Sequence, residues 1–442
     1  MANVSSARHA AFRILLAVEA GKGHSDDLLR SAAVSALAPV DRNLATALVL
    51  GVLRWQLQLD ADLRQLLARP NARLDAEVLI ALRLGAFQLL HMDRIPARAA
   101  IDESVELTKE SGHRFAARMV NAVLRKLVAE YAEKPRHGPE SAAYPGWLTE
   151  RWADCFGAET ARAICCHGQS QPALTVRLVD PAAEAELIHS GIQLDAAEML
   201  VAARTVLSGD ITATSAYCDG RVRIQDEGSQ LIAEIAGQGD AILDCCAAPG
   251  GKALILAERN PGARIVACEA SVSRLAALRE RLAPLDDRID CRHLDAATLD
   301  ESGAFDLVLA DVPCSGTGTL GRNPEIRHRL APDDFARQTE RQRAILGAAI
   351  RATREGGRVV YSTCSLEPEE NEQVIAAVLA AHENVRVLPL ALRLEEMEAA
   401  AILIEAGVRR LEGAVTAEGY LRLIPGRFGT DGFFVAVLEK LN

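Results

Sequence analysis

The second half of this chain alternates short apolar runs with segments of helical periodicity, and this order limits the folds that it can adopt. The strand-like runs are Ala241 to Asp244, Arg264 to Cys268, Phe305 to Ala310 and Arg358 to Tyr361. Strands separated by helices in this way are typical of a parallel, doubly wound α/β sheet with helices on both faces. A final pair of segments, Tyr420 to Ile424 and Gly432 to Leu438, predicts an antiparallel hairpin that closes the sheet.

The first part of the chain has a purely helical pattern. From Ser5 to Tyr131 apolar residues recur at the spacing of an amphipathic helix, which predicts an all-α domain. A polar segment rich in helix breakers at residues 134–139 predicts a linker, and Ala173 to Val179 and Val222 to Gln225 indicate strands beyond it. We therefore expect three domains: an all-α domain over residues 1–138, a small α+β domain over residues 139–235 and an α/β domain over residues 236–442.

The composition is that of a soluble globular protein, with 49% hydrophobic and 25% charged residues. A net charge of −11 argues against a protein that coats nucleic acid through bulk electrostatics. No stretch is apolar for the length of a membrane span, and the amino terminus lacks an uninterrupted secretory core. We expect a cytoplasmic protein with no membrane partner.

The ten cysteines are expected to be mostly reduced thiols. One cluster resembles metal ligands, namely Cys155, Cys165, Cys166 and His167. Adjacent cysteines point in different directions on a helix, and no second ligand pair follows, so we expect no metal. Three further cysteines, Cys245, Cys268 and Cys291, are expected to act as small hydrophobic residues beside strands.

Two other cysteines stand directly after predicted strands. Cys314 lies in Asp-Val-Pro-Cys-Ser-Gly-Thr-Gly at residues 311–318, and Cys364 lies in Tyr-Ser-Thr-Cys-Ser at residues 361–365. Because neighbouring strands are about 4.8 Å apart, we expect both thiols to face one planar substrate at the same edge of the sheet. Each is followed by Ser in a turn, where a reactive thiol finds exposure and polar neighbours.

Such a pair suits methylation of a pyrimidine ring carbon. Carbon 5 of cytosine is a poor nucleophile, and a thiolate that adds to carbon 6 activates it by temporarily removing the aromaticity of the ring. A second ionisable group then assists loss of the carbon 5 proton and expulsion of the thiol. Asp311 could hydrogen-bond the polar edge of the ring. The residue chemistry alone does not assign the two cysteines to these roles.

A small-residue turn follows the first strand of the α/β part. This turn consists of Cys246, Ala247, Ala248, Pro249, Gly250, Gly251 and Lys252. It lacks the glycine patterns of nicotinamide-binding and triphosphate-binding loops. Glu269 at the end of the second strand is placed to accept the hydroxyls of a ribose, and Asp295 has the corresponding place after a weak third strand near Cys291. Either acid alone is more often a helix cap. Together they favour a nucleoside-bearing cofactor, and the absence of a phosphate cradle points to S-adenosyl-L-methionine.

Three motifs carry a resemblance to a known family. Asp-x-Cys-Ala-Ala-Pro-Gly-Gly-Lys at residues 244–252, Asp-x-Pro-Cys-Ser-Gly-Thr-Gly at 311–318 and Ser-Thr-Cys-Ser at 362–365 resemble the RNA cytosine-5 methyltransferases of the Sun/Fmu family. Residues 41–42, 51–55 and 120–125 resemble the NusB-like RNA-binding domain of the branch that modifies bacterial 16S ribosomal RNA. Residues 225–230 and 431–434 are also similar, so the likeness spans nearly the whole chain.

The resemblance implies a Rossmann-like class I methyltransferase domain, a NusB-like domain and an RRM-like domain between them. It implies that Cys364 attacks the base and that Cys314 assists release. It also implies an S-adenosylmethionine pocket lined by residues 246–252, Glu269, Asp295 and Asp311. The expected substrate is small-subunit ribosomal RNA, the product 5-methylcytosine, and the enzyme a monomer that acts in rRNA processing.

The chain departs from the family pattern at a few positions, and several alternatives stay open. Ala253 stands where Thr is common, Val312 replaces a customary Ala, and Glu325 stands where Asp is usual in a segment, residues 322–325, that in relatives contacts the target region. A transfer RNA cytosine-5 methyltransferase shares the catalytic motifs. The chain could also be a non-catalytic RNA-binding ribosome-assembly factor. DNA cytosine methyltransferases use the cysteine of a Pro-Cys pair as nucleophile, so the reverse roles of the two cysteines are also considered.

Overall fold

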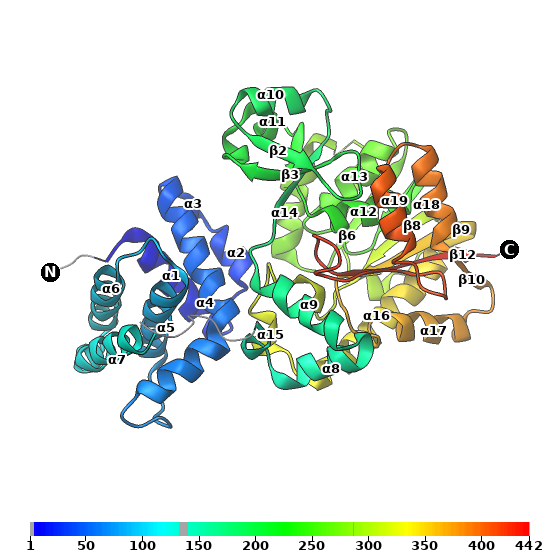
Figure 1. Ribbon diagram of the computed structural model, residues 1–442. Helices are drawn as coiled ribbons and strands as arrows, with labels where there is room; N and C mark the ends of the chain where they lie inside the picture. The colour runs from blue at the N-terminus through cyan, green and yellow to red at the C-terminus, as the bar shows by residue number, and fades with distance from the viewer. Residues whose placement is uncertain (1–3, 132–139, 286, 442) are drawn as a thin grey trace. The chain divides into compact units, whose positions relative to one another are not determined.

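The computed structural model describes residues 4–131, 140–285 and 287–441 (Figure 1). The chain folds into two compact units, and each combines segments that are distant in sequence. The helical unit comprises Met1–Gln171 and Leu320–Arg329, and the sheet unit comprises Pro172–Thr319 and Leu330–Asn442. The domain boundary expected between residues 138 and 139 lies outside the described residues. The two units meet in sequence at Gln171 and Pro172 instead, because the helices on the amino-terminal side of this point pack within the helical unit.

The helical unit confirms the all-α fold expected from the apolar periodicity. Its α-helices are α1 (Ser6–Glu19), α2 (Ser25–Leu29), α3 (Ala32–Ser35), α4 (Pro39–Leu66), α5 (Ala76–His91), α6 (Ala97–Glu110), α7 (Ala117–Glu130), α8 (Gly146–Phe156), α9 (Ala158–Gln169) and α15 (Ile326–Arg329). Short 3-10 turns add η1 (Arg114–Ala116) and η2 (Glu140–Ala143). Leu82 and Ala86 of α5 are fully buried, as their spacing on one helix face requires.

The segment Leu320–Arg329 is held inside the helical unit by hydrogen bonds. The buried guanidinium of Arg327 donates to Gln169 Oε1 at 2.6 Å and to the carbonyl oxygens of Gly168 and Leu320, each at 3.1 Å. The Glu325 carboxylate accepts from both the backbone N–H and the hydroxyl of Ser25 at 2.8 Å. These bonds, rather than helical periodicity, bind this piece of chain to helices that lie far away in sequence.

A small antiparallel sheet opens the sheet unit. Its strands are β1 (Leu174–Leu178), β2 (Gln193–Ala196), β3 (Ala203–Ser208) and β4 (Val222–Ile224), in the order β2-β3-β1-β4. Helices α10 (Ala183–His189), α11 (Ser215–Cys218) and η3 (Ile211–Ala213) accompany it. β1 and β4 confirm the two strands expected in this region. Arg177 on β1 donates to Glu258 at 2.8 Å and pairs with Glu234 at 2.8 Å, which joins the small sheet to the helices of the larger one.

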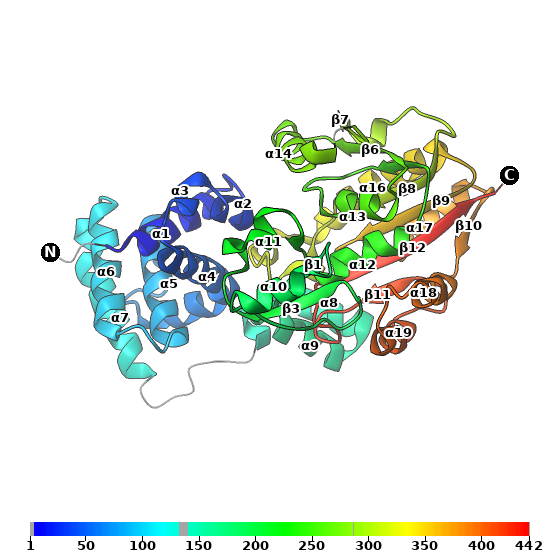
Figure 2. The same ribbon diagram turned by 90° about the horizontal axis from the view of Figure 1, so that it is seen from above.

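The larger sheet has the order β10-β12-β9-β8-β5-β6-β7, with β11 paired to β12. Its strands are β5 (Ala241–Asp244), β6 (Arg264–Glu269), β7 (Ile289–His293), β8 (Phe305–Asp311), β9 (Thr353–Thr363), β10 (Val385–Leu388), β11 (Leu421–Leu423) and β12 (Phe433–Lys440). Strands β5 to β9 run parallel, whereas β10, β11 and β12 pair antiparallel. The doubly wound sheet and its closing hairpin are therefore confirmed (Figure 2).

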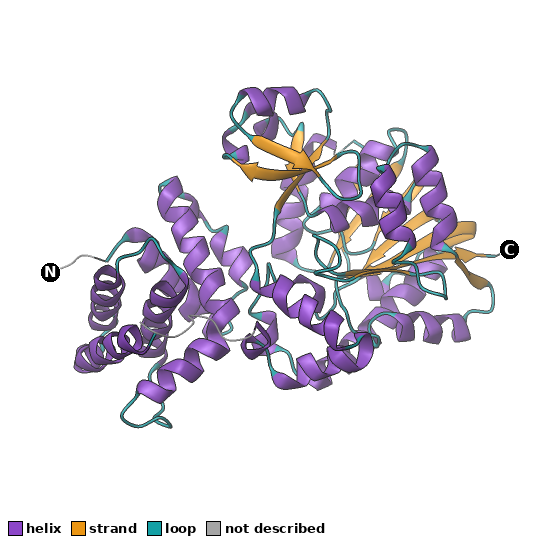
Figure 3. Ribbon diagram, in the orientation of Figure 1, coloured by secondary structure: helices purple, strands orange, loops and turns teal. Residues whose placement is uncertain are grey.

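Helices cover both faces of this sheet (Figure 3). They are α12 (Glu227–Ala236), α13 (Gly251–Arg259), α14 (Val272–Leu282), α16 (Pro332–Ala352), α17 (Glu372–Ala381), α18 (Leu390–Ala399) and α19 (Glu405–Glu412), with the short turns η4 (Ala283–Leu285), η5 (Ala296–Thr298) and η6 (Thr317–Thr319). Alternate strand residues enter two separate cores, since Leu307 packs with Leu256 of α13 and Val308 packs with Ile345 of α16. Among the described helices none is long and apolar enough to cross a membrane.

Candidate active site at the carboxyl edge of the sheet

The two predicted cysteines lie side by side at the carboxyl edge of the larger sheet. Strands β8 and β9 are adjacent and parallel, with Asp311 opposite Ser362, so the turns that follow them begin at the same edge. The sulfur atoms of Cys314 and Cys364 are 3.3 Å apart. Both side chains are half-buried and keep a part of their surface exposed. A planar group that enters this edge can therefore reach both sulfurs.

The surroundings of Cys314 favour its protonated form. The hydrogen bond to Cys364, burial and the nearby Glu370 charge all raise the pKa of Cys314 well above its ordinary value. Cys314 is therefore a thiol at neutral pH. Because a thiol is a donor, Cys314 can donate its proton to a thiolate on Cys364 across the 3.3 Å that separates them.

An ion pair lies beside this thiol pair. Lys252 Nζ donates to Asp311 Oδ2 at 2.6 Å, and the Ser362 hydroxyl donates to Asp311 Oδ1 at 2.7 Å. Burial lowers the pKa of Lys252, but the Asp311 carboxylate, Asp244 and Cys364 outweigh it, and the net pKa is raised. Lys252 therefore holds a positive charge, and Cys364 lies close enough to contribute to its raised pKa.

The predicted cofactor turn connects β5 to α13. The Ala247 N–H donates to the Cys268 carbonyl at 2.9 Å, which ties the turn to β6. Gly250 caps α13 with φ +96°, a left-handed conformation that favours glycine. A Cβ on Gly251 would lie 3.2 Å from the Gln225 side chain, so the turn runs close to the chain that precedes α12.

Glu269 and Asp295 occupy the strand ends expected of them, and each also accepts a hydrogen bond from a nearby backbone N–H. Glu269 Oε1 accepts from the Ser271 N–H at 2.8 Å, and its second oxygen is 3.5 Å from Arg274. Asp295 Oδ1 accepts from the Ala297 N–H at 3.1 Å at the start of η5. Each carboxylate therefore retains acceptor capacity after its local hydrogen bond is made.

Asp244, at the end of β5, is a site residue that the sequence reasoning did not single out. Its side chain is buried, and burial followed by the Asp311 charge raises its pKa to about 7. Oδ2 of Asp244 has no hydrogen-bond partner among the described residues. An unpartnered buried acceptor at the start of the turn is a place for a polar ligand. Its position as the first residue of the turn motif was the available sequence signal.

Cys245, Cys268 and Cys291 were expected to act as small hydrophobic residues. Cys245 and Cys268 are buried, and burial raises the pKa of Cys268 to about 12. Cys291 is half-buried, and burial raises its pKa too. No group of three or more His, Cys, Asp or Glu residues suited to a metal ion occurs in the described part of the chain, including the region of Cys165 and His167.

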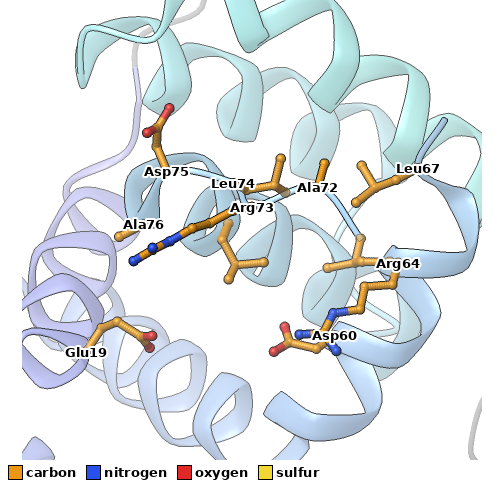
Figure 4. A pocket seen from close by; sticks show the side chains of 11 residues that line it. Glu19, Asp60, Arg64, Leu67, Ala72, Arg73, Leu74, Asp75 and Ala76 are labelled. Atoms are coloured by element: carbon orange, nitrogen blue, oxygen red, sulfur yellow. The ribbon is translucent and has the colours of Figure 1, made fainter. Parts of the chain in front are cut away.

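The helical unit contains a cavity of about 660 Å³ (Figure 4). Its lining includes Glu19, Asp60, Arg64 and Arg73, and none of the predicted site residues lines it. Arg83 forms ion pairs with both Asp60, at 2.7 Å, and Glu19, at 3.0 Å.

The fold and the site define a Rossmann-like methyltransferase. The family model described as 16S rRNA methyltransferase RsmB/F matches residues 235–439, and the NusB family model matches residues 5–129. The chain belongs to this RsmB/F family, the Sun/Fmu methyltransferases, and carries their NusB domain. The family's cofactor is S-adenosylmethionine. The unpartnered oxygen of Asp244 and the remaining acceptor capacity of Glu269 fit this cofactor, which carries an amine and ribose hydroxyls.

Relatives share the full length of the chain. The probable ribosomal RNA small subunit methyltransferase B of Bacillus subtilis is 33% identical over 99% of both chains. The ribosomal RNA small subunit methyltransferase B of Pseudomonas putida is 33% identical over 98% of both chains. The crystal structure of PH0851 matches with a TM-score of 0.79 at 23% identity and covers 99% of this chain and 100% of that chain, which shows the fold. A methyltransferase homologue from Pyrococcus horikoshii matches with a TM-score of 0.54 at 26% identity over 67% of this chain and 96% of that chain.

Proposed function

We propose that this protein methylates carbon 5 of a cytosine in 16S ribosomal RNA through a covalent adduct with Cys364. The observation that supports this most directly is the 3.3 Å approach of two thiols beside the Lys252–Asp311 pair, at the end of the cofactor turn. Addition of a thiolate to carbon 6 makes carbon 5 nucleophilic. Bound S-adenosylmethionine supplies an electrophilic methyl group.

Cys364 is the better candidate for the attacking thiolate. Its neighbour Cys314 is held as a thiol, and the Lys252 ammonium lies close enough for Cys364 to contribute to its raised pKa. After methyl transfer a base, such as water, takes the carbon 5 proton, the electron pair of that C–H bond re-forms the double bond between carbons 5 and 6, and the bond between carbon 6 and sulfur breaks with its electron pair on the Cys364 sulfur. Cys314 is placed to assist this release, and Asp311 to hydrogen-bond the polar edge of the ring.

The substrate assignment rests on the relatives and on the NusB domain. Both full-length relatives are named as small-subunit ribosomal RNA methyltransferases, and the NusB match supplies a helical domain for RNA binding. The target base has to leave its stack to meet both sulfurs, so a single-stranded or looped region is the favoured target. We place this cytoplasmic enzyme in the modification of small-subunit RNA.

The test combines substrate mapping with trapping of the adduct. Incubation with labelled S-adenosylmethionine and separated RNA classes should place 5-methylcytosine in 16S RNA. Label confined to transfer RNA would defeat the substrate assignment and leave the mechanism standing. Cys364→Ala should abolish the covalent protein–RNA species, whereas Cys314→Ala should let it accumulate on denaturing gels. An adduct formed by Cys364→Ala would instead support the reverse assignment of the cysteines.

A further inference from the structure

We propose that Glu370 is a positioning residue that holds the two cysteines together for the reaction. Its buried carboxylate hydrogen-bonds to the turn that carries Cys314 and to the turn that carries Cys364, and so sets the separation of the two sulfurs. The role of Glu370 in turnover rests on the proposed function. Its role in setting the separation of the two sulfurs does not.

Four donors converge on this carboxylate. Oε1 of Glu370 accepts from the Ser315 N–H at 2.8 Å and from Gln342 Nε2 at 2.9 Å. Oε2 accepts from the hydroxyl of Ser315 and, at 2.5 Å, from the hydroxyl of Ser365. Ser315 directly follows Cys314, and Ser365 directly follows Cys364. One side chain therefore bonds to the residue next to each thiol.

The partners of Glu370 are themselves anchored. Gln342 on α16 also donates to the carbonyl of Pro313 at 3.0 Å, which is the residue before Cys314. The Tyr361 hydroxyl donates to the backbone carbonyl of Glu370 at 2.6 Å. Glu370 is completely buried, so its position is fixed by β9 and α16 rather than by solvent. The carboxylate therefore fixes the position of the Cys314 turn relative to the Cys364 turn.

The four donors around Glu370 match the two accepting oxygens of a carboxylate. An ionised carboxylate only accepts, with two oxygens that can serve all four donors. The amide of glutamine offers one oxygen and two N–H donors. Glu370→Gln would therefore replace one of the two accepting oxygens with an N–H donor that faces the serine hydroxyl groups. Burial is the largest effect and the pKa of Glu370 is raised, while the hydrogen bonds from Ser315 and Ser365 act in the opposite direction and limit this rise. The charge also helps to keep Cys314 protonated.

The experiment compares full-length Glu370→Gln and Glu370→Ala with a control that removes a different buried carboxylate. Glu227 is 2% exposed and accepts backbone N–H groups of Glu198, Met199 and Leu200 at 3.0, 2.7 and 2.7 Å. Glu227→Gln therefore removes a similar buried charge from the same unit without touching either cysteine turn. Ser315→Ala removes one hydroxyl partner of Glu370. This variant replaces Glu370→Ala in the comparison if Glu370→Ala fails to fold.

Two readouts separate positioning from stability. The first is kcat against KM for RNA methylation, where misplacement of a reacting group by 1 Å costs about 100-fold in rate. We expect kcat of Glu370→Ala to fall by about that factor while KM for S-adenosylmethionine stays unchanged. The second is the affinity of the reduced protein for phenylarsine oxide. This probe forms two S–As bonds with a close pair of thiols and releases its oxygen as water with the two thiol protons, so no oxidant is needed.

Phenylarsine oxide should bind the wild type and Glu227→Gln tightly and the Glu370 variants weakly, with Cys364→Ala as the baseline for a single thiol. Wild-type kcat and arsenical affinity in folded Glu370→Gln and Ser315→Ala would overturn the inference. Equal losses in Glu370→Gln and Glu227→Gln would overturn it as well, because they would report stability alone. A wild type that makes no 5-methylcytosine would defeat the proposed function, and the arsenical comparison would still decide whether Glu370 holds the thiols together.

Discussion

The buried carboxylate of Asp244 makes folding stability depend on pH. Its pKa is raised from 3.8 to about 7, mainly by burial. Between these values the folded protein keeps a proton on Asp244 that the unfolded chain has released, so stability falls as the pH rises. The expected slope is about 1.4 kcal/mol per pH unit. Above about pH 7 both states are ionised, and the penalty becomes constant.

Asp244→Asn should remove this contribution. We expect the cofactor-free variant to gain stability relative to the wild type as the pH rises from about 5 to about 7, and to bind S-adenosylmethionine less tightly. Urea unfolding of both proteins across this range measures the first effect, and calorimetric titration measures the second. Parallel stability curves for the two proteins over the whole range would show that Asp244 is ionised in the fold.

At the scale of residues, sequence motifs predicted site residues where a reactive side chain directly follows a predicted strand. Cys314, Cys364 and Lys252 each follow a predicted strand, and the structure brings them to one edge of the sheet. Glu370 could not be chosen in the same way. It lies in an acidic run, residues 367–372, that has the composition of a solvated surface. Only tertiary packing buries this one carboxylate against two serine hydroxyls.

At the scale of elements, the turn after β8 is packed between the other cysteine turn and the start of β12. The Gly318 N–H donates to the Cys364 carbonyl at 2.9 Å, and the Gly432 N–H donates to the Gly318 carbonyl at 2.8 Å. A Cβ on Gly318 would lie 2.5 Å from the Gly432 carbonyl oxygen and 2.8 Å from that of Cys364. Backbone atoms on both sides leave no room for a side chain.

Gly318→Ala should therefore push the two cysteine turns apart. We expect a destabilisation of about 1 to 3 kcal/mol, typical of overpacking, together with a loss of adduct formation that exceeds the loss of folded protein. Gly262→Ala is the matched control, because a Cβ there meets no atom within 4 Å. Thermal unfolding and the trapping assay measure the two effects. A Gly318→Ala protein as active and stable as Gly262→Ala would contradict the packing described here.

The strands were largely predictable because their apolar runs reflect burial on both faces. Ala241 to Asp244 matches β5, and the weak run near Cys291 is β7. Strands β2 and β3 were not predicted, because helices were expected between β1 and β4, and neither was strand β10. Strand β10 has four residues, Val385–Leu388, and it is a strand because it pairs with β12, which begins 45 residues later in the chain. Such non-local pairing leaves little trace in a short local pattern.

At the scale of the whole molecule, the segment Leu320–Arg329 is part of the core of the helical unit. Arg327 is completely buried, its guanidinium stacks over the Tyr144 ring at 3.9 Å, and it donates to the backbone or side chain of several residues of this unit. Burial lowers the pKa of Arg327, so the charge is maintained by these acceptors and by the Tyr144 ring.

Arg327→Ala should destabilise the helical unit, because the Gly168 carbonyl and the Gln169 side chain would lose a buried donor. We expect a loss of about 2 to 4 kcal/mol. Arg337→Ala is the control, since the Arg337 side chain is 78% exposed and should contribute little. Denaturant unfolding of the full-length variants measures the difference in their free energies of unfolding. Proteolysis of the folded variants measures how well residues 320–329 are protected. Equal stability of the two variants would show that the segment is not held by Arg327.

The sequence by itself determined the class of fold, and it predicted that Cys314 and Cys364 directly follow two strands of the sheet, because apolar periodicity, strand ends and motif spacing are local properties of the chain. Tertiary structure alone decided that Leu320–Arg329 packs in the helical unit, although the residues before and after it belong to the sheet unit. It also decided that Glu370 and Asp244 are buried. Each of these outcomes depends on contacts between residues that are separated in the chain. Burial and hydrogen bonding across such distances change the energy of a charged group without changing the local pattern around it.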